Sequence, residues 1–285
     1  LGESNQHLMN TAWGGTGSSL PANETNSLYQ TMVGESGLRD LANTSAILDG
    51  TYSMMGGESY DRIESARRLN SSEYTLNAAL GFISLNTTLN PDEVLAVAFE
   101  YSYNGQVYQV GEFSTDNGGD AKAPNALFLK LLKGTNSTPI AGKKGRGTWD
   151  LMMKNIYSLG ASSITSDKFE LNIMYRNDSI GTEMQYINEG NIRGKQLLRV
   201  FNLDRLDQKH NPSPDGKFDY VEGFTVLSSS GRIIFPVLEP FGSHLAAQLG
   251  NNPTLTNKYC FQELYDSTLV VAQENSEKNK FTLTG

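Results

Sequence analysis

Residues 73–113 restrict the possible folds more than any other stretch, because apolar and polar residues alternate there in short runs. The runs 95–103 and 107–113 are separated by the dipeptide Asn104-Gly105. Both central residues of a type I′ turn need a positive φ, which Asn and Gly adopt readily. The stretch therefore predicts a β-hairpin, and the alternating residues just before it predict a further pair of strands.

Other segments predict the remaining elements. Alternating or β-rich runs favour strands at 169–175 and 197–201 and a hairpin at 223–238. Helix-type spacing, with capping residues and a following glycine at the clearest of these segments, favours helices at 124–133, 148–159 and 259–272. We expect an α+β, β-dominated fold in which sandwich-like antiparallel sheets from 73–113 and 169–238 are covered by these helices.

The sequence also suggests a division of the chain. Residues 1–58 are polar and interrupted by glycine pairs, which is typical of an extended or irregular segment with room for short helices at 28–33 and 38–48. Residues 59–285 are predicted to form a β-rich body. Within it, two related units are expected, at 59–160 and 161–285.

An internal similarity supports the two related units. The segment 224–235 (FTVLSSSGRIIF) has the layout of 74–85 (YTLNAALGFISL). In each, an aromatic residue is followed seven positions later by a glycine, Gly81 or Gly231, and then by an apolar run. The two segments are therefore expected to fold alike.

Composition excludes several classes of protein. The 285 residues carry a formal charge of −8, which disfavours a binder of nucleic-acid backbones, since these need a basic face. The only cysteine, Cys260, excludes an intrachain disulfide and a cysteine-rich zinc site, and its apolar surroundings predict a buried, inert thiol. No apolar run is long enough for a transmembrane helix. Because the chain starts at Leu1 without a leader pattern, we expect a piece of a longer protein.

The motifs of common enzymes are absent from the sequence. The three histidines, at 7, 210 and 244, are far apart in the chain, and none has a partner at metal-binding spacing. No GxSxG, GxGxxG or Walker pattern occurs. A hydrolase that uses two carboxylates needs no fixed spacing, so this class stays open. The sequence favours a protein that is not an enzyme and that needs no organic cofactor.

One acidic segment, 202–223, suggests a metal site. Calcium takes six to eight oxygen ligands, and five carboxylates surround a Pro-Asp-Gly turn here. These calcium-ligand candidates are Asp204, Asp207, Asp215, Asp219 and Glu222. The spacing of an EF-hand loop is missing, so a second interpretation stands beside calcium. In it, Asp215-Gly216 forms a turn and the other carboxylates cap, pair with Arg205 or face water.

Long segments of the chain resemble one known family. The strings LGFISLNTTLNPDEVLAVAFEYSYNGQVYQVGEFS, TWDLMMKNIYSLG, LLRVFNLDRLDQKHNPSPDGKFDYVEGFTVLSSSGRIIFPVLEPFGSHL and YCFQELYDSTLVVAQ occur in the order typical of the SprA/Sov family. This family comprises the giant outer-membrane proteins of type IX secretion and gliding motility in Bacteroidota. The resemblance covers residues 50–285 and rests on long strings rather than on a short motif.

The resemblance implies a function for the chain. The parent protein forms a very large β-barrel through which folded cargo crosses the outer membrane, and this chain lacks the succession of alternating ten-residue strands of a barrel wall. It is therefore expected to be a non-enzymatic, extramembranous subdomain of the translocon at the outer membrane. Its expected partners are other secretion proteins, secreted cargo and the rest of the parent barrel. The alternative is a cell-surface adhesin or ligand-binding β-sandwich stabilised by calcium.

Overall fold

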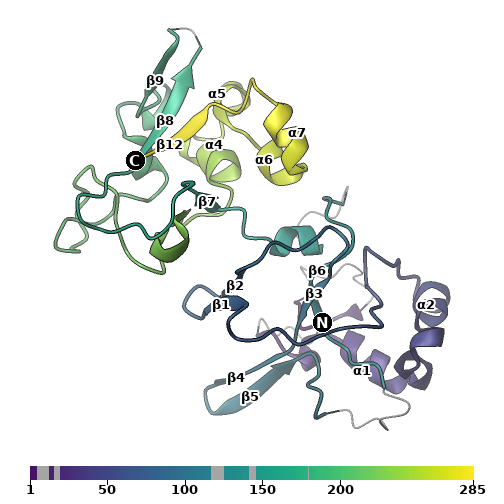
Figure 1. Ribbon diagram of the computed structural model, residues 1–285. Coiled ribbons are helices and arrows are strands. Elements are labelled where there is room, and N and C mark those ends of the chain that lie inside the picture. The colour runs from purple at the N-terminus through teal and green to yellow at the C-terminus, as the bar shows by residue number, and fades with distance from the viewer. Residues whose placement is uncertain (5–12, 16–19, 117–124, 141–145, 179) are drawn as a thin grey trace. The chain divides into compact units, whose positions relative to one another are not determined.

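The chain divides into two compact units in the computed structural model (Figure 1). Unit 1 comprises Leu1–Leu76 and Ile83–Met152, and unit 2 comprises Asn77–Phe82 and Met153–Gly285. The structure describes residues 1–4, 13–15, 20–116, 125–140, 146–178 and 180–285.

Two short helices of unit 1 lie in the segment predicted to be extended, at the positions where helices were expected. They are α1 (Leu28–Gly34) and α2 (Leu41–Gly50). The Asp40 side chain caps α2 by accepting a hydrogen bond from the Ala42 N–H at 3.0 Å. The buried Leu38 and Leu48 pack with Phe128 in the core of unit 1, so residues 1–58 contribute directly to that core.

The hairpin predicted around Asn104-Gly105 is confirmed. Strands β4 (Phe99–Tyr103) and β5 (Gln106–Val110) pair antiparallel, with Tyr103 opposite Gln106. Asn104 has a φ of 51° and Gly105 a φ of 77°, as a type I′ turn requires. Tyr101 and Tyr108 stack across the two strands with their ring centroids 5.3 Å apart.

The prediction of a helix at 124–133 is wrong for residues 125–133, the part of this segment that the structure describes. Strand β6 (Lys130–Lys133) pairs antiparallel with β3 (Leu95–Val97) instead. Phe128 is buried whereas Leu127 and Leu129 are exposed, which is the two-residue alternation of an extended chain. The short run of leucines and lysines fits the period of a helix as well as that of a strand. Pairing with β3 makes it a strand.

The prediction of a helix at 148–159 is also wrong. A 3₁₀ turn (Thr148–Leu151) is followed by strand β7 (Ile156–Ser158). Asn155 explains the extended chain, because its carbonyl accepts a hydrogen bond from the Phe235 N–H (2.9 Å) and its side-chain amide donates one to the Phe235 carbonyl (2.7 Å). This contact between distant parts of the chain outweighs the local helical pattern.

Unit 2 contains two three-stranded antiparallel sheets. In one, the order is β10-β11-β7, where β10 is Val226–Leu227 and β11 is Arg232–Ile234. In the other, the order is β12-β8-β9, formed by β12 (Phe281–Thr284), β8 (Asn172–Asn177) and β9 (Thr182–Met184). The strand predicted at 169–175 thus begins three residues later, and the hairpin predicted at 223–238 is confirmed as β10–β11.

The two segments predicted to fold alike share a local structure. β1 (Tyr74–Asn77) and β2 (Phe82–Leu85) pair with each other, as β10 and β11 do. The glycine before the second strand is left-handed in both, with φ of 72° at Gly81 and 59° at Gly231. The similarity therefore extends from the sequence to the backbone conformation.

The predicted strand at 197–201 is a helix, α3 (Leu197–Val200). Leu197, Leu198, Val200 and Phe201 are buried, whereas Arg199 between them is exposed. A segment this short with a single polar position fits a helical turn as well as a strand, so its pattern does not separate the two.

The single helix predicted at 259–272 is interrupted. Following α4 (Leu245–Gln248), three short helices occur, with extended residues at Cys260 and Ser267 between them. They are α5 (Pro253–Tyr259), α6 (Glu263–Asp266) and α7 (Leu269–Glu274). The Phe261 N–H donates to the Phe241 carbonyl at 2.7 Å, and this long-range bond holds the chain in the first break.

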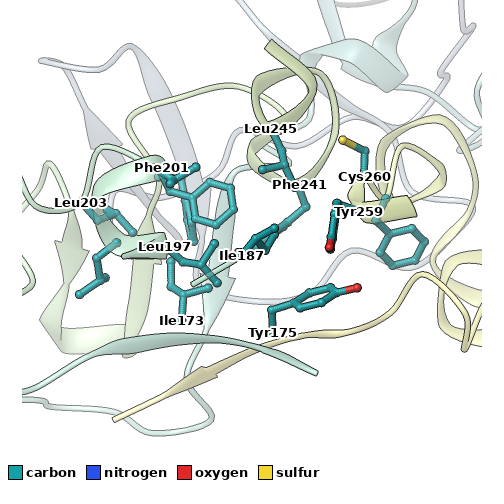
Figure 2. Packing of buried hydrophobic residues seen from close by; sticks show 14 of the residues in the cluster. Ile173, Tyr175, Ile187, Leu197, Phe201, Leu203, Phe241, Leu245, Tyr259 and Cys260 are labelled. Atoms are coloured by element: carbon teal, nitrogen blue, oxygen red, sulfur yellow. The ribbon is translucent and has the colours of Figure 1, made fainter. Parts of the chain in front are cut away.

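The core of unit 2 gathers residues from most of its elements. Figure 2 shows Ile173 and Tyr175 of β8, Phe201 beside α3, and Phe241 within this cluster. Phe201 and Phe241 pack edge to face with ring centroids 5.0 Å apart. Tyr157, Phe235 and Phe281 extend the same aromatic group.

The fold is α+β, as predicted. Helices and strands occupy comparable shares of the described residues, so the expected dominance of strands is not seen. The sheets of the described residues have two or three strands. Nowhere in the described ranges is a helix both long and apolar enough to cross a bilayer.

Candidate functional site

An apolar groove on unit 2 is a concave site among the described residues. Its volume is about 210 Å³. Aromatic rings form much of its lining, contributed by Tyr157, Phe241, Phe261 and Phe281. Pockets that bind ligands or peptide side chains have this kind of lining, with a few polar groups at the margin.

The helices α6 and α7 supply the aliphatic part of the lining. Leu264 comes from α6, whereas Leu269 and Ala272 come from α7. Leu283 of β12 completes the apolar surface. Two amides, those of Gln273 and Asn279, are the polar lining side chains.

A hydrogen-bonded pair of tyrosines, Tyr157 and Tyr265, contacts the lining of the groove, and Tyr157 is itself a lining residue. The hydroxyl oxygens of Tyr157 and Tyr265 lie 3.1 Å apart, and the Phe241 N–H donates to the Tyr265 hydroxyl at 2.9 Å. Burial raises the pKa of both hydroxyls well above the usual value for tyrosine, so both stay protonated at neutral pH. The pair holds Phe241 in place and offers no acid–base chemistry near pH 7.

Helix α7 exposes apolar side chains next to the groove. Leu269, Val270 and Val271 are 66%, 62% and 52% exposed. Leu269 and Ala272 of the same helix line the groove, so the exposed residues continue its apolar surface outward. A contiguous apolar surface of this kind is typical of a site for a protein partner.

The five calcium-ligand candidates bind backbone N–H groups. Asp204, which is buried, accepts from the N–H of Asp215 (2.9 Å) and of Gly216 (3.2 Å). Asp219 accepts from the N–H of Arg205 at 2.7 Å and from that of the next residue. Burial raises the pKa of Asp219 despite these bonds. These two carboxylates thus connect the ends of the loop.

The other three candidates have similar roles. Asp207 accepts from Lys209 and Asn211, and Asp215 accepts from the Lys217 N–H. Glu222 accepts from the Ser228 N–H at 3.1 Å. Across the described residues, no three His, Cys, Asp or Glu side chains converge as a group that would hold a metal ion. The turn interpretation fits these contacts, and calcium binding stays a hypothesis.

Only a weak signal for the groove is present in the amino-acid sequence. Its lining residues come from β7, the Phe241 turn, α6, α7 and β12, which no local pattern connects. The one available signal is the run of residues 269–272 (LVVA), because consecutive apolar residues in a helix cannot all face one side. In a helix at the protein surface, at least one of them is therefore exposed.

Comparison with known proteins adds no assignment. No family model matches the chain, and no curated protein matches it.

Proposed function

We propose that this chain is a non-enzymatic, extramembranous subdomain of an outer-membrane protein-secretion translocon, and that it docks other secretion proteins. The observation that carries the proposal is the exposed apolar face of α7 beside the aromatic groove. Burying such side chains against a partner is favourable by about 25 cal/mol per Å² of apolar surface. An exposed apolar helix face next to a preformed groove is thus suited to binding a protein.

The resemblance of residues 50–285 to the SprA/Sov family supplies the context of the proposal. In that context the partners are components of type IX secretion and its cargo, at the bacterial outer membrane. The architecture is compatible with this role, since unit 2 has its own aromatic core and presents the groove on short, packed helices. Sites on rigid elements bind with less loss of conformational entropy.

The test uses the full parent chain in its native bacterium. A photo-crosslinking residue, p-benzoylphenylalanine, replaces Val270 on α7, and mass spectrometry identifies the proteins joined to it. Ser213, an exposed residue of the acidic loop in the same unit, is the control position. We expect secretion components or cargo at Val270 and not at Ser213. Crosslinks at neither position would contradict the proposal.

A substitution tests whether docking matters for secretion. Val270→Asp places a charge on the exposed face, and Val107→Asp on β5 is the matched control, since Val107 is 60% exposed. Both changes should alter the free energy of unfolding by no more than about 0.5 kcal/mol. We expect Val270→Asp alone to reduce cargo secretion at unchanged amounts of the parent chain. Equal secretion by both variants would count against the proposal.

A further inference from the structure

Strand β12 is an outer strand of its sheet: β8 pairs with one side of it, and no strand of the described residues pairs with the other. The register pairs Phe281 with Tyr175 and Leu283 with Ile173, and the Arg176 N–H donates to the Lys280 carbonyl at 3.0 Å. In an antiparallel ladder the hydrogen-bonding direction alternates along each strand. The N–H and carbonyl groups of Phe281 and Leu283 therefore point away from β8.

These four outward groups are available for pairing. Among the described residues, none of them has a hydrogen-bond partner. β12 also contains neither a charged residue nor a proline, the usual means of blocking an outer strand. The opposite edge of the same sheet differs, because β9 places the exposed Glu183 there.

The groove lies beside this open strand. The side chains of Phe281 and Leu283 line it from β12, and Leu269 and Ala272 line it from α7. An added strand on β12 would direct alternate side chains to the side where the groove lies. One apolar side chain of such a strand is thus matched by a cavity of about 210 Å³.

The surroundings of the groove are acidic. Residues 261–280 contain four carboxylates and two ammonium groups: Lys278 donates a hydrogen bond to the Asn257 carbonyl, and Lys280 pairs with Asp178. Glu263, at the start of α6, and Glu274, at the end of α7, are exposed. Charge complementarity therefore favours an occupant with lysine or arginine beside its apolar residue.

We propose that β12 receives an extended segment of a partner protein as an additional antiparallel strand, with one apolar side chain in the groove and basic residues facing Glu263 and Glu274. This inference rests on the proposed docking function and specifies how the partner binds. Backbone pairing supplies affinity in such complexes, and the side-chain pocket supplies specificity. A second copy of this chain, paired β12 to β12, is the competing occupant.

The first experiment places p-benzoylphenylalanine at Thr282 of the full parent chain in its native bacterium and sequences the joined segment. Thr282 is exposed on β12 and lies next to an added strand. We expect a segment of another protein in which an apolar residue is flanked by lysine or arginine. A segment from a second copy or from elsewhere in the parent chain, or no crosslink, would overturn the proposal.

The second experiment uses the captured segment as a synthetic peptide with purified parent protein. N-methylation removes an amide donor, so methyl groups on residues that face β12 should weaken binding at least about ten-fold. Methyl groups on the alternate residues should leave it unchanged. Equal sensitivity at both sets of positions would rule out strand addition.

Two proline variants provide a matched control on the protein side. Leu283→Pro removes an outward N–H of β12 without touching the ladder to β8, and Glu183→Pro does the same on the outer side of β9. Leu283→Ala keeps the N–H and removes only side-chain contacts. We expect at least ten-fold weaker peptide binding in Leu283→Pro than in Leu283→Ala, and unchanged binding in Glu183→Pro. Equal binding by all three would contradict the proposal.

Two further comparisons complete the test: charge-neutralising variants beside the groove, and the partners crosslinked at Val270 against those crosslinked at Thr282. Neutralising Glu263 or Glu274 to Gln should weaken binding about two- to five-fold each, as expected for exposed pairs. Secretion partners captured at Val270 but absent at Thr282 would overturn strand addition and leave the proposed docking function standing. No partner at either position would overturn both.

Discussion

Arg39 and Glu112 form a two-point ion pair inside unit 1. Arg39 Nη1 lies 2.7 Å from Glu112 Oε2, and Nη2 lies 2.7 Å from Oε1. The Glu112 carboxylate, which is 3% exposed, also accepts from the Phe128 N–H (3.0 Å) and from the Tyr29 hydroxyl (3.0 Å). One carboxylate thus joins the turn after β5, the segment before β6 and the region of α1 and α2.

Replacement of Glu112 by Gln should destabilise unit 1. The change leaves the Arg39 guanidinium without its charged partner, and breaking a largely buried pair in this way costs about 2–3 kcal/mol. Glu73→Gln is the control, since Glu73 forms a similar two-point pair with Arg67 at an exposed site. Hydrogen exchange of the amides of β5 and β6 measures the effect. Equal protection in the two variants would contradict this role of Glu112.

Acidification should destabilise unit 1 through protonation of the Glu112 carboxylate. Burial alone would raise the pKa of Glu112, but hydrogen bonds from Arg39, the Phe128 N–H and Tyr29 outweigh it and lower the pKa. A carboxyl with a lowered folded pKa stabilises the fold above its ordinary pKa of about 4.3. This stability is lost as the pH falls through the folded pKa. The protection factor of the Phe128 amide, in which the pH dependence of intrinsic exchange is divided out, should therefore fall on acidification more in the native chain than in Glu112→Gln.

Gly231 and Gly81 provide a matched pair of backbone substitutions. A Cβ on Gly231 would lie 1.8 Å from the Ala161 carbonyl oxygen, whereas a Cβ on Gly81 meets nothing within 4 Å. Both glycines have a positive φ, which costs an alanine about 1 kcal/mol. Gly231→Ala should therefore lower the free energy of unfolding by about 2–4 kcal/mol and Gly81→Ala by about 1 kcal/mol. Denaturant titration compares them, and a reversed order would exclude the clash.

The hydroxyl of Tyr265 should matter more than that of Tyr157. Tyr265→Phe leaves the Phe241 N–H without its acceptor and removes the partner of Tyr157, which should cost about 1–3 kcal/mol. Tyr157→Phe removes only one of these contacts and should cost less. Thermal unfolding at a common pH gives the comparison. If Tyr157→Phe were the more damaging change, the bond to Phe241 would not be the main contribution.

Sequence reasoning succeeded where a backbone need is tied to residue type. Asn104-Gly105 requires positive φ values that few residues adopt, so the hairpin β4–β5 was predictable. Prediction from the sequence failed where contacts between distant parts of the chain determine the secondary structure. The bonds between Asn155 and Phe235 and the pairing of β6 with β3 override helical patterns at these positions. The segment 197–201, in which only Arg199 is exposed, is too short for its period to separate a helix from a strand.

The groove was harder to predict than the fold. Tyr157, Phe241 and Phe281 are far apart in the sequence, yet their rings pack together, with the Phe241 and Phe281 ring centroids 4.7 Å apart. What the sequence does not contain is the interruption of the last helix at Ser267, which turns α7 so that Val270 and Val271 are exposed. Tyr265, two residues before that break, accepts a long-range hydrogen bond from the Phe241 N–H.

Calcium should have little effect on the stability of the acidic loop. The oxygens of Asp204 and Asp219 already accept backbone hydrogen bonds, so coordination would have to replace these bonds. We expect 1 mM calcium to shift the melting temperature no more than 1 mM magnesium does, and Asp215→Ala to leave this result unchanged. A large shift specific to calcium that Asp215→Ala abolishes would instead support the calcium hypothesis and, with it, the adhesin alternative.

Cys260 provides a reporter of opening in unit 2. The thiol is buried, and burial raises its pKa to about 11, with Lys278 acting in the opposite direction. At pH 8 the thiolate is thus rarer by about 10²-fold than in an ordinary cysteine, and the thiolate is the reactive form. Labelling by a thiol reagent should therefore be slow in the native chain. It should quicken in Gly231→Ala, whose clash lies in the same unit, and remain slow in Glu112→Gln, whose damage lies in unit 1. Fast labelling of the native chain would show that Cys260 is accessible, and equal rates in the two variants would show that the units do not unfold independently.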